Sequence, residues 1–397
     1  MPTIAMIGQK GLPARSGGVE RHVQHLASSL VERGHRVIVF GRAWYVGQSK
    51  APKGVEQVIT AGIKSKHLDA ITHSVTAIFA ARKLRPDIVH VHGVGIAVLL
   101  PLIRLVVPKA KIVVTFHCID RVREKWGAIA RAVLTMGEWM ACHLADRTVT
   151  VSQELARYCA KTYGVQPWYI THAIPNVKPP TALEESLAKH GLQNNRYFLF
   201  VGRLISDKGA HLLVEAYAKA AAMPESPLKD MSLVLVGASS FTDEYAKRLC
   251  YRAAMIPNVH YLGERVGDEL FALQAGALAH VFPSSSEGLS LATIEACQLS
   301  KTVIATDIEA NFETTGGWMV PVQAEDIDGL ATALMRVAAR SDAERRELGE
   351  RARAHVERAH DVDARSADMI QVYADTLGVT RELVTPITLP TDQLAAT

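Results

Sequence analysis

Cysteine is scarce in this sequence, which has 5 cysteines among 397 residues. They are scattered, without a Cys-x-x-Cys pair or zinc-like spacing, which argues against a disulfide framework and a structural metal. A reducing compartment fits best, so we expect a cytoplasmic protein. The residues are Cys118, Cys142, Cys159, Cys250 and Cys297.

Long hydrophobic runs and a leader-like N-terminus are also lacking. The longest apolar run, 95–103, is broken by Pro101 and followed by Arg104. It falls well short of the roughly 20 apolar residues of a membrane-spanning helix. The chain enters a strand-like run at 3–7 without a basic leader and apolar core. We therefore expect neither a membrane span nor secretion.

The sequence has no large excess of charge of one sign. Its 44 Lys and Arg residues face 40 Asp and Glu residues, for a net charge of +4. This small, dispersed charge comes without an aromatic-basic motif, so nucleic acid is not expected as a partner. The hydrophobic share of 48% is typical of globular proteins, and the length predicts two domains.

Short apolar, β-branched runs alternate with amphipathic stretches along the whole chain. This alternation predicts an α/β fold of two doubly wound, Rossmann-like domains, with helices on both faces of parallel sheets. Ligands of such sheets bind beyond the carboxyl ends of the strands, so we expect the function in a cleft between the domains. The predicted strands are 3–7, 36–40, 88–91, 111–115 and 147–151, then 197–201, 232–236, 259–262, 280–282 and 302–305.

The pattern lapses between Tyr169 and Arg196, where prolines and a polar segment indicate a linker. We predict an N-terminal domain at 1–180, a linker at 181–195 and a C-terminal domain at 196–360. A helix at 361–380 is expected to pack back toward the N-terminal domain. The remaining residues, 381–397, lack periodicity and are expected to form a mobile tail.

A basic, glycine-containing loop, 202–209, lies directly after a predicted strand and before a predicted helix. Arg203 offers a planar charged fork and Lys208 a point charge, while glycine lets the backbone approach a ligand. Together these features suit two adjacent phosphates. The structural alternative is a solvated turn with incidental charges.

A second polar loop, 284–296, again joins a strand to a helix and carries two carboxylates. Glu287 lies in the loop and Glu295 about one turn into the helix, so both can face the cleft. Leu289 and Ser290 present backbone N–H groups at the helix N-terminus. Carboxylates suit sugar and ribose hydroxyls. The alternative is a helix cap with an unrelated surface Glu295.

The first domain offers weaker signals. Gly17 and Gly18 close a loop that is neither Gly-x-Gly-x-x-Gly nor a Walker sequence, yet they permit close approach of a phosphate or sugar. His117 ends a strand facing the cleft, suited to hydrogen bonding or proton transfer, or else it is a satisfied buried histidine.

No metal site is predicted. His90 and His92 alternate along one strand, but no third ligand is evident, so a core role is preferred. The Asp-x-Asp triplets at 326–328 and 361–363 both lie at helix starts, where capping and the helix dipole explain carboxylates.

GRLISDKG and SSSEGLSLATIEA resemble the paired donor-site motifs of the family four retaining glycosyltransferases, which have the GT-B fold. SGGVERHVQHLASSLVERGHRVIVF, PDIVHVH, VTFHCID and IPN also stand where that family has its glycine loop, third-strand end, sugar-contacting histidine and interdomain linker. The resemblance spans nearly the whole chain. Ser290 is a departure, because such chains usually read Glu-Gly-Phe-Gly there.

The resemblance implies a role for each matching residue. Arg203 and Lys208 would hold the donor diphosphate, Glu295 the ribose hydroxyls, and Glu287 would face the transferred sugar. The backbone of Leu289 and Ser290 would meet phosphate and His117 would touch the donor sugar. Gly17 and Gly18 would lie near phosphate and acceptor. The implied reaction is metal-independent transfer of a hexose or deoxyhexose from a nucleotide diphosphate sugar to a saccharide or lipid-linked saccharide. It needs no cofactor.

Two alternatives remain open. A GT-B sugar-nucleotide epimerase or phosphorylase would share the cleft, and a non-catalytic nucleotide-sugar-binding subunit would share the donor site. A basic cluster beside Trp126 and the apolar run 96–107 also suggests peripheral contact with the inner face of the membrane. The cluster comprises Lys109, Lys111, Arg121, Arg123, Lys125 and Arg131.

Overall fold

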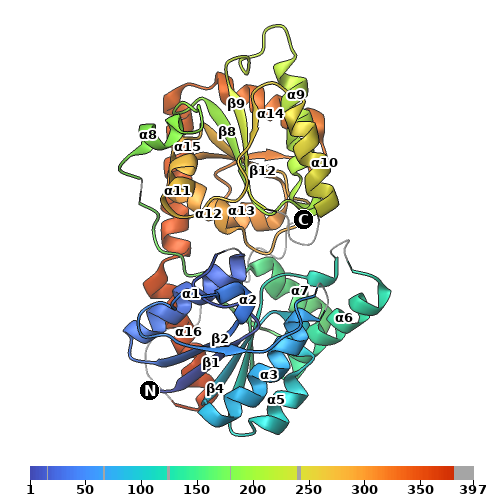
Figure 1. Cartoon of the computed structure of the whole chain (residues 1–397), viewed down its shortest axis with the longest axis vertical. Coiled ribbons are helices and arrows are strands. Elements are labelled where there is room, and N and C mark those ends of the chain that lie inside the picture. Colours follow the sequence, from blue (N-terminus) through green and yellow to red (C-terminus); the bar gives the residue numbers. More distant parts are fainter. Residues whose placement is uncertain (16, 66–67, 123–125, 179, 239–242, 380–397) are drawn as a thin grey trace.

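A computed structural model describes residues 1–15, 17–65, 68–122, 126–178, 180–238 and 243–379. The chain forms two α/β domains that are stacked along the long axis of the molecule (Figure 1). The predicted fold class is therefore confirmed. The predicted tail at 381–397 lies outside the described residues, as does Ser16 in the glycine loop.

The N-terminal domain is built on a seven-stranded parallel sheet with the order β3-β2-β1-β4-β5-β6-β7. Val89 and Val91 on the central strand are fully buried, as expected for a sheet covered on both faces. The strands are β1 (Thr3–Ile7), β2 (Arg36–Arg42), β3 (Glu56–Thr60), β4 (Ile88–His92), β5 (Lys111–Phe116), β6 (Arg147–Thr150) and β7 (Trp168–Tyr169).

Helices cover both faces of this sheet. On the first of them, Val23, Leu26 and Leu30 recur at three- and four-residue intervals and are buried against the strands. The helices are α1 (Gly18–Glu32), α2 (Ala43–Val46), α3 (Asp69–Leu84), α4 (Val94–Ala97), α5 (Leu100–Val106), α6 (Ala128–His143) and α7 (Gln153–Tyr163), with a 3₁₀ turn η1 (Asp120–Val122).

The C-terminal domain repeats the plan around a six-stranded parallel sheet with the order β10-β9-β8-β11-β12-β13. Its strands are β8 (Tyr197–Val201), β9 (Ser232–Val236), β10 (Val259–Tyr261), β11 (Ala279–Phe282), β12 (Thr302–Thr306) and β13 (Val320–Val322). Its helices are α9 (Ala210–Ala221), α10 (Asp243–Ala254), α11 (Gly267–Gly276), α12 (Leu291–Gln298), α13 (Glu309–Thr315), α14 (Ile327–Ala339) and α15 (Asp342–Ala359), with a 3₁₀ turn η2 (Ser206–Lys208).

The predicted linker at 181–195 needs correction. It contains the short helix α8 (Leu183–Ala188), which packs against α11. Leu187 and Leu192 are buried in the core of the second sheet beside Tyr197. These residues therefore belong to the C-terminal domain, and the chain crosses between the domains just before them.

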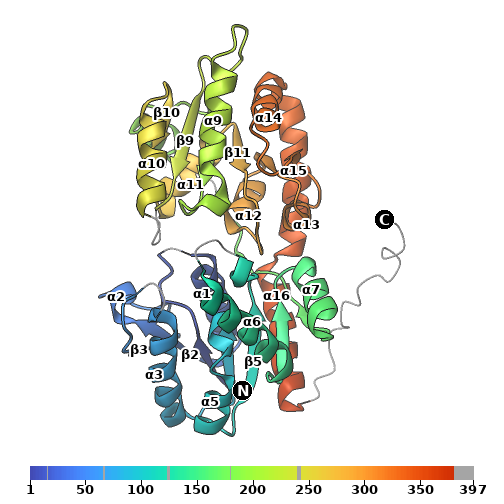
Figure 2. The same ribbon diagram turned by 90° about the vertical axis from the view of Figure 1, so that its right-hand side faces the viewer.

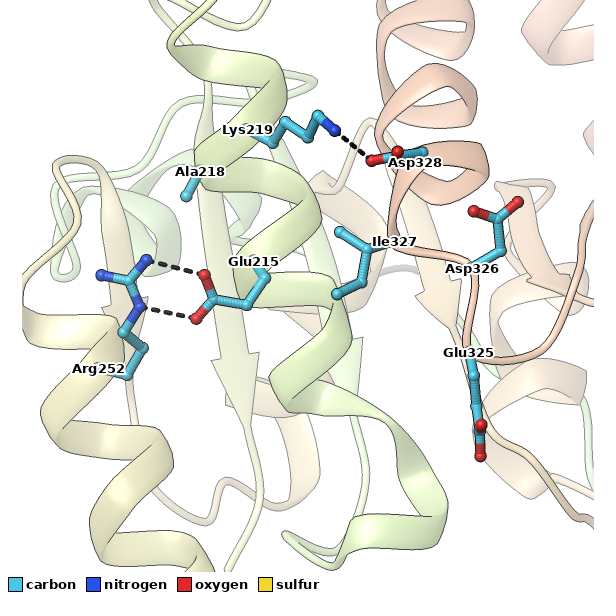
Figure 3. Close-up of a pocket in the computed structure, with 8 residues that line it drawn as sticks. All are labelled: Glu215, Ala218, Lys219, Arg252, Glu325, Asp326, Ile327 and Asp328. Carbon is cyan, nitrogen blue, oxygen red and sulfur yellow. Dashed lines mark hydrogen bonds and ion pairs between the residues drawn. The ribbon is translucent and has the colours of Figure 1, made fainter.

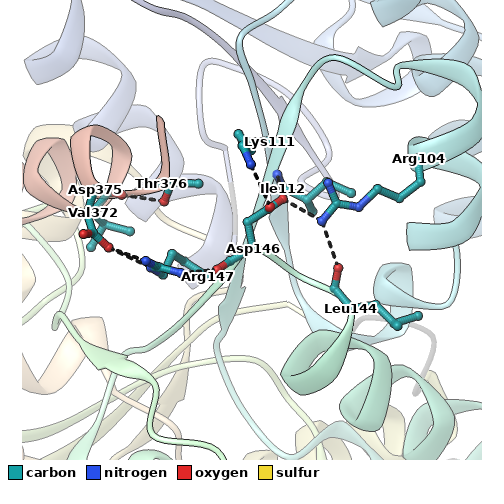
Figure 4. A network of polar contacts seen from close by, with 9 residues as sticks. All are labelled: Arg104, Lys111, Ile112, Leu144, Asp146, Arg147, Val372, Asp375 and Thr376. Carbon is teal, nitrogen blue, oxygen red and sulfur yellow. Dashed lines mark hydrogen bonds and ion pairs between the residues drawn. The ribbon is translucent and has the colours of Figure 1, made fainter. Parts of the chain in front are cut away.

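The last described helix, α16 (Val362–Leu377), lies among the N-terminal helices, although it follows the C-terminal domain in sequence (Figures 1 and 2). Met369, Val372 and Tyr373 are buried in the N-terminal core. An ion pair of 2.7 Å joins Arg147 at the start of β6 to Asp375 (Figure 4). The two domains are thus connected by two crossings of the chain.

The apolar run 96–107 was expected beside a membrane-facing surface, and this part of the interpretation is wrong. Ile96, Leu100 and Ile103 are buried in the N-terminal core. Two cations of the predicted basic cluster form ion pairs, Lys111 with Asp146 (Figure 4) and Arg121 with the fully buried Glu138. Arg123 and Lys125 lie outside the described residues. Within the described ranges, none of the helices combines the length and apolar character needed to cross a bilayer.

Candidate active site at the domain interface

The loop 202–209 leaves the carboxyl end of β8 and turns into α9. Gly209 has φ 69°, and a β-carbon there would overlap the carbonyl oxygen of Pro283. Only glycine can therefore bring this turn against the end of β11. The backbone N–H of Ser285 donates to the carbonyl of Asp207 at 3.0 Å, which joins the two polar loops.

Lys208 and Glu287 form an ion pair across these two loops. The side chain of Lys208 is 19% exposed and that of Glu287 is 7% exposed, so the pair is largely removed from water. Arg203 is half-buried on the same loop as Lys208. The arrangement differs from the solvated turn that sequence reasoning held open.

Glu295 is buried rather than on the surface, with 1% of its area exposed. One carboxylate oxygen accepts a hydrogen bond from Gln274 Nε2 at 2.9 Å, and the other pairs with Arg21. Arg21 lies on α1, so this ion pair joins the two domains. The alternative of an unrelated surface glutamate is therefore excluded.

The glycine loop and His117 lie directly opposite the 287–295 segment. A β-carbon at Gly18 would lie 3.8 Å from the Leu291 side chain, and one at Gly288 would overlap the carbonyl oxygen of His117. Leu289 packs against the cores of both domains. Gly17, with φ 98°, precedes the first turn of α1. The structure thus brings the predicted residues of the two domains together at one interface.

Ser290, the departure from the family pattern, has a local structural role. Its hydroxyl accepts a hydrogen bond from the backbone N–H of Thr293 at 3.3 Å and caps α12. The predicted caps at the Asp-x-Asp triplets are also confirmed. Asp326 accepts from Gly329 N at 2.9 Å and Asp361 from Ala364 N at 2.7 Å.

A cluster of buried histidines lines the N-terminal side of the interface. His22 on α1 makes edge-to-face ring contacts with His92, His117 and His172, at centroid distances of 5.7, 5.3 and 4.5 Å. Burial lowers the pKa of His22 to about 3 and lowers the pKa values of the other three well below 6.5. These imidazoles are therefore neutral at physiological pH.

His90 and His92 behave differently, although they share a strand. His90 bonds Tyr373 and Thr115 at 2.7 Å each, so its predicted core role is confirmed. His92 Nδ1 lies 3.3 Å from His117 Nε2, and its Nε2 has no hydrogen-bond partner.

Comparisons with known proteins agree with this geometry. Residues 16–176 match Glycosyltransferase Family 4, and residues 195–340 match Glycosyl transferases group 1. The chain belongs to this glycosyltransferase family. Glycogen synthase of Mycobacterium tuberculosis is 26% identical over 84% of this chain and 85% of its own length. D-inositol 3-phosphate glycosyltransferase of Gordonia bronchialis is 28% identical over 88% of this chain and 82% of its own.

Solved structures establish that this glycosyltransferase has the GT-B fold. Sucrose-phosphate synthase of Thermosynechococcus elongatus superposes with a TM-score of 0.81 at 22% identity, covering 96% of this chain and all of that one. Anabaena HepE in complex with UDP and glucose superposes with a TM-score of 0.77 at 18% identity, covering 94% and 100%.

A surface pocket of the glycosyltransferase lies away from this interface, between α9, α10 and the start of α14 (Figure 3). Four of its six charged lining residues are paired with one another, Glu215 with Arg252 and Lys219 with Asp328. None of the predicted site residues lines it. The candidate active site therefore remains the one at the domain interface, where the predicted residues meet.

Sequence reasoning missed two features of this site, the pairing of Arg21 with Glu295 and the position of His22 among the other histidines. Arg21 and His22 both lie on α1, directly after the glycine loop. His22 lies at the apolar spacing of that helix, next to Val23 and one turn before Leu26, and this spacing by itself predicts only a buried residue. Only the packing of α1 over the ends of β4 and β5 reveals its neighbours.

Proposed function

We propose that this glycosyltransferase is a retaining, metal-independent enzyme. It transfers a hexose or deoxyhexose from a nucleoside diphosphate sugar to a saccharide or lipid-linked saccharide in cell-surface polysaccharide or glycolipid synthesis. One observation supports the proposal most strongly. Glu295 and the Lys208–Glu287 pair are both largely buried, and they lie at the interface that the glycine loop and His117 line from the other domain. A buried carboxylate and a buried cation suit ribose and diphosphate, respectively.

The donor-binding roles follow from this placement. Arg203 and Lys208 bind the diphosphate, and the backbone of Leu289 and Ser290 meets it at the start of α12. Glu295 accepts hydrogen bonds from the ribose hydroxyls. Arg21 and Gln274 contact its two oxygens in the structure. Donor binding therefore exchanges the Arg21 contact for ribose.

On the N-terminal side, the side chain proposed to contact the transferred sugar is uncharged. His117 contacts the donor sugar as a neutral imidazole, because burial holds its pKa well below 6.5. Gly17 and Gly18 leave room for phosphate and acceptor beside α1. Glu287 faces the sugar from the C-terminal domain.

The proposed mechanism is a front-face displacement. As the anomeric bond breaks, negative charge develops on the leaving diphosphate, where Arg203 and Lys208 stabilise it. The leaving oxygen takes the proton of the incoming hydroxyl. Two cations supply the charge that a metal ion would otherwise provide, which supports metal independence.

A thermal-shift screen tests the proposal. UDP-sugars come first, because the structural relative HepE has been solved with UDP and glucose, followed by GDP-, ADP- and dTDP-sugars. We expect one donor to raise the melting temperature, with or without chelator, and Arg203→Ala and Lys208→Ala to abolish the effect. If both variants respond like the unmodified protein, the diphosphate assignment is wrong.

Product analysis separates the alternatives. A phosphorylase releases sugar phosphate when given inorganic phosphate, and an epimerase interconverts donors without releasing nucleotide. A binding subunit is stabilised by donor but releases nothing with any acceptor. We expect nucleoside diphosphate release that depends on an acceptor, with the anomeric configuration retained.

A lipid-linked acceptor is supported by one surface of the N-terminal domain. Ile129, Met136 and Trp139 on α6 are 84%, 45% and 46% exposed, at spacings that place them on one side of the helix. Arg131 is exposed on the same helix. An apolar stripe beside a cation is typical of helices that lie on anionic bilayers.

Liposome flotation tests this membrane contact. We expect the protein to float with anionic vesicles at low salt, and the double variant Ile129→Ser, Trp139→Ser to remain in the soluble fraction. Lys219→Ser, on the C-terminal domain, serves as the surface control and should float normally. Failure of the unmodified protein to float at low salt would remove the membrane contact from the proposal.

A further inference from the structure

Several buried ring nitrogens of the histidine cluster have no hydrogen-bond partner among the described residues, which is unusual for a polar core. Neither ring nitrogen of His22 has a hydrogen-bond partner among the described residues, although the residue is only 2% exposed. His92 Nε2 and His117 Nδ1 are also buried without partners. A neutral imidazole carries one N–H and one lone pair, and buried groups of both kinds are normally satisfied. The cluster is therefore built for something beyond packing.

The spacing of the rings matches a coordination site. One ring nitrogen from each of His22, His92 and His117 lies within 4.8 Å of the others. The 3.3 Å between His92 Nδ1 and His117 Nε2 is long for a hydrogen bond. It equals the edge of a tetrahedron whose nitrogens stand roughly 2.0–2.1 Å from a zinc ion, which is about 3.3 Å.

The centroid distances lead to the same geometry. His22, His92 and His117 are separated by 5.3 to 5.7 Å between ring centroids. Three imidazoles on one tetrahedral ion place their centroids about 5 Å apart.

We propose that His22, His92 and His117 form a binding site for a divalent transition-metal ion of the zinc class. Three imidazoles without carboxylate or carbonyl ligands favour zinc, copper or nickel over magnesium or calcium. Burial keeps the rings neutral, which is the form that binds metal. His172, whose Nδ1 is buried and has no hydrogen-bond partner among the described residues, lies next to the group, with its ring centroid 4.5 Å from that of His22.

Metal binding at this position would affect glycosyl transfer. The ion would join α1 to the ends of β4 and β5. Coordination through His117 would also withdraw that imidazole from the donor sugar. We therefore expect the metal to stabilise the protein and to inhibit glycosyl transfer. The binding itself does not depend on the proposed function.

The first experiment measures metal binding without any donor. Protein stripped with chelator is titrated with Zn²⁺ against a chromophoric competitor, and separately with Co²⁺, whose visible absorption reports tetrahedral coordination. We expect one equivalent per chain, a tetrahedral Co²⁺ spectrum and a higher melting temperature. His22→Gln should weaken binding by roughly 100-fold, because it removes one of three ligands. His25→Gln, on the same helix but outside the group, should bind normally.

Circular dichroism checks that each variant is folded before titration. If His22→Gln does not fold, X-ray absorption of the zinc-loaded unmodified protein decides the question. A spectrum that shows zinc surrounded by nitrogen atoms, with the multiple scattering typical of three or four imidazoles, supports the site. A spectrum that shows zinc surrounded by six oxygen atoms overturns it. Absence of stoichiometric binding, or equal binding by His22→Gln, also overturns it and leaves the rings as a packed core cluster. Donor binding in the thermal-shift screen is measured with chelator, so the two proposals can fail separately.

Discussion

The two faces of the domain interface carry charge in different ways. The C-terminal face carries charged side chains that form ion pairs, Lys208 with Glu287, and the buried Glu295 with Arg21 from α1 of the N-terminal domain. The N-terminal face instead carries imidazoles whose burial lowers their pKa values well below 6.5. A buried charged side chain needs an oppositely charged or hydrogen-bonding partner, whereas a buried histidine can lose its proton and become neutral.

This contrast suits the proposed division of labour. A diphosphate needs fixed cations, and the C-terminal face has them in place of bulk water. A sugar hydroxyl needs neutral hydrogen-bond donors and acceptors. Neutral imidazoles supply both, and they do not compete with Arg203 and Lys208 for the diphosphate. The predictions below test this contrast, beginning with the residue whose loss should matter most.

Lys208→Ala should produce the largest loss. Without the cation, the charge that develops on the leaving diphosphate loses one of its two partners, and Glu287 is left largely buried and unpaired. We expect kcat/KM to fall by about 100- to 1,000-fold. Initial-rate kinetics with the donor found in the screen provide the measurement. Lys219→Ala removes a comparable ion pair on the surface of the same domain (Figure 3) and should change kcat/KM less than about twofold.

Glu295→Gln should come next. The amide keeps the shape of the side chain but loses the negative charge that makes its hydrogen bonds to ribose strong. We expect the donor KM to rise by about 10- to 100-fold with a smaller change in kcat. Glu215→Gln, in the exposed pair with Arg252, is the control. A change confined to kcat would place Glu295 at the reacting sugar instead of the ribose.

The charged face could be predicted well from the sequence, because its residues lie in two short loops that follow strands directly. Buried strands such as β1, β8 and β9 were also predicted with their observed bounds. Three edge strands were missed for physical reasons. β3 is largely uncovered and begins with Glu56, β7 has two residues, and β13 contains Pro321.

The neutral face could not be predicted in the same way. Its histidines come from α1, from two strand ends and from the domain crossing, and no local pattern connects them. The periodicity of α1 correctly places His22 on the buried side of the helix. It says nothing about which other side chains share that space, which is a property of the tertiary fold.

The acid sensitivity of the two domains should differ. Burial lowers the pKa of His22 and His90 to about 3, against 6.5 when exposed. The unfolded state therefore binds more protons below pH 6.5, so this contribution to stability is complete above that pH and is lost as the pH falls from 6.5 toward about 3. The free energy of unfolding should fall by several kcal/mol over this pH range, because each pKa unit corresponds to about 1.4 kcal/mol.

Hydrogen exchange followed by mass spectrometry measures this difference in the presence of chelator. Between pH 7 and pH 5, after correction for intrinsic exchange rates, peptides of α1, β4 and β5 should lose protection before those of β8 and β9. The C-terminal sheet contains one comparable histidine, His280 on β11, whose pKa burial lowers to about 4. Equal loss in both domains would contradict the proposed contrast.

The smallest effect is expected from Arg21→Gln, which breaks the one ion pair that joins the two faces at Glu295. Because ribose and Arg21 compete for the same carboxylate, removing the arginine should tighten donor binding. Arg21 is 29% exposed, so the gain should be no more than about fivefold in the donor dissociation constant. Isothermal titration provides the measurement, and Arg33→Gln, which removes the Asp363 pair at the other end of α1, is the matched control. Weaker binding by Arg21→Gln alone would mean that Arg21 turns to the donor diphosphate once ribose displaces it, so that the N-terminal face supplies a cation of its own.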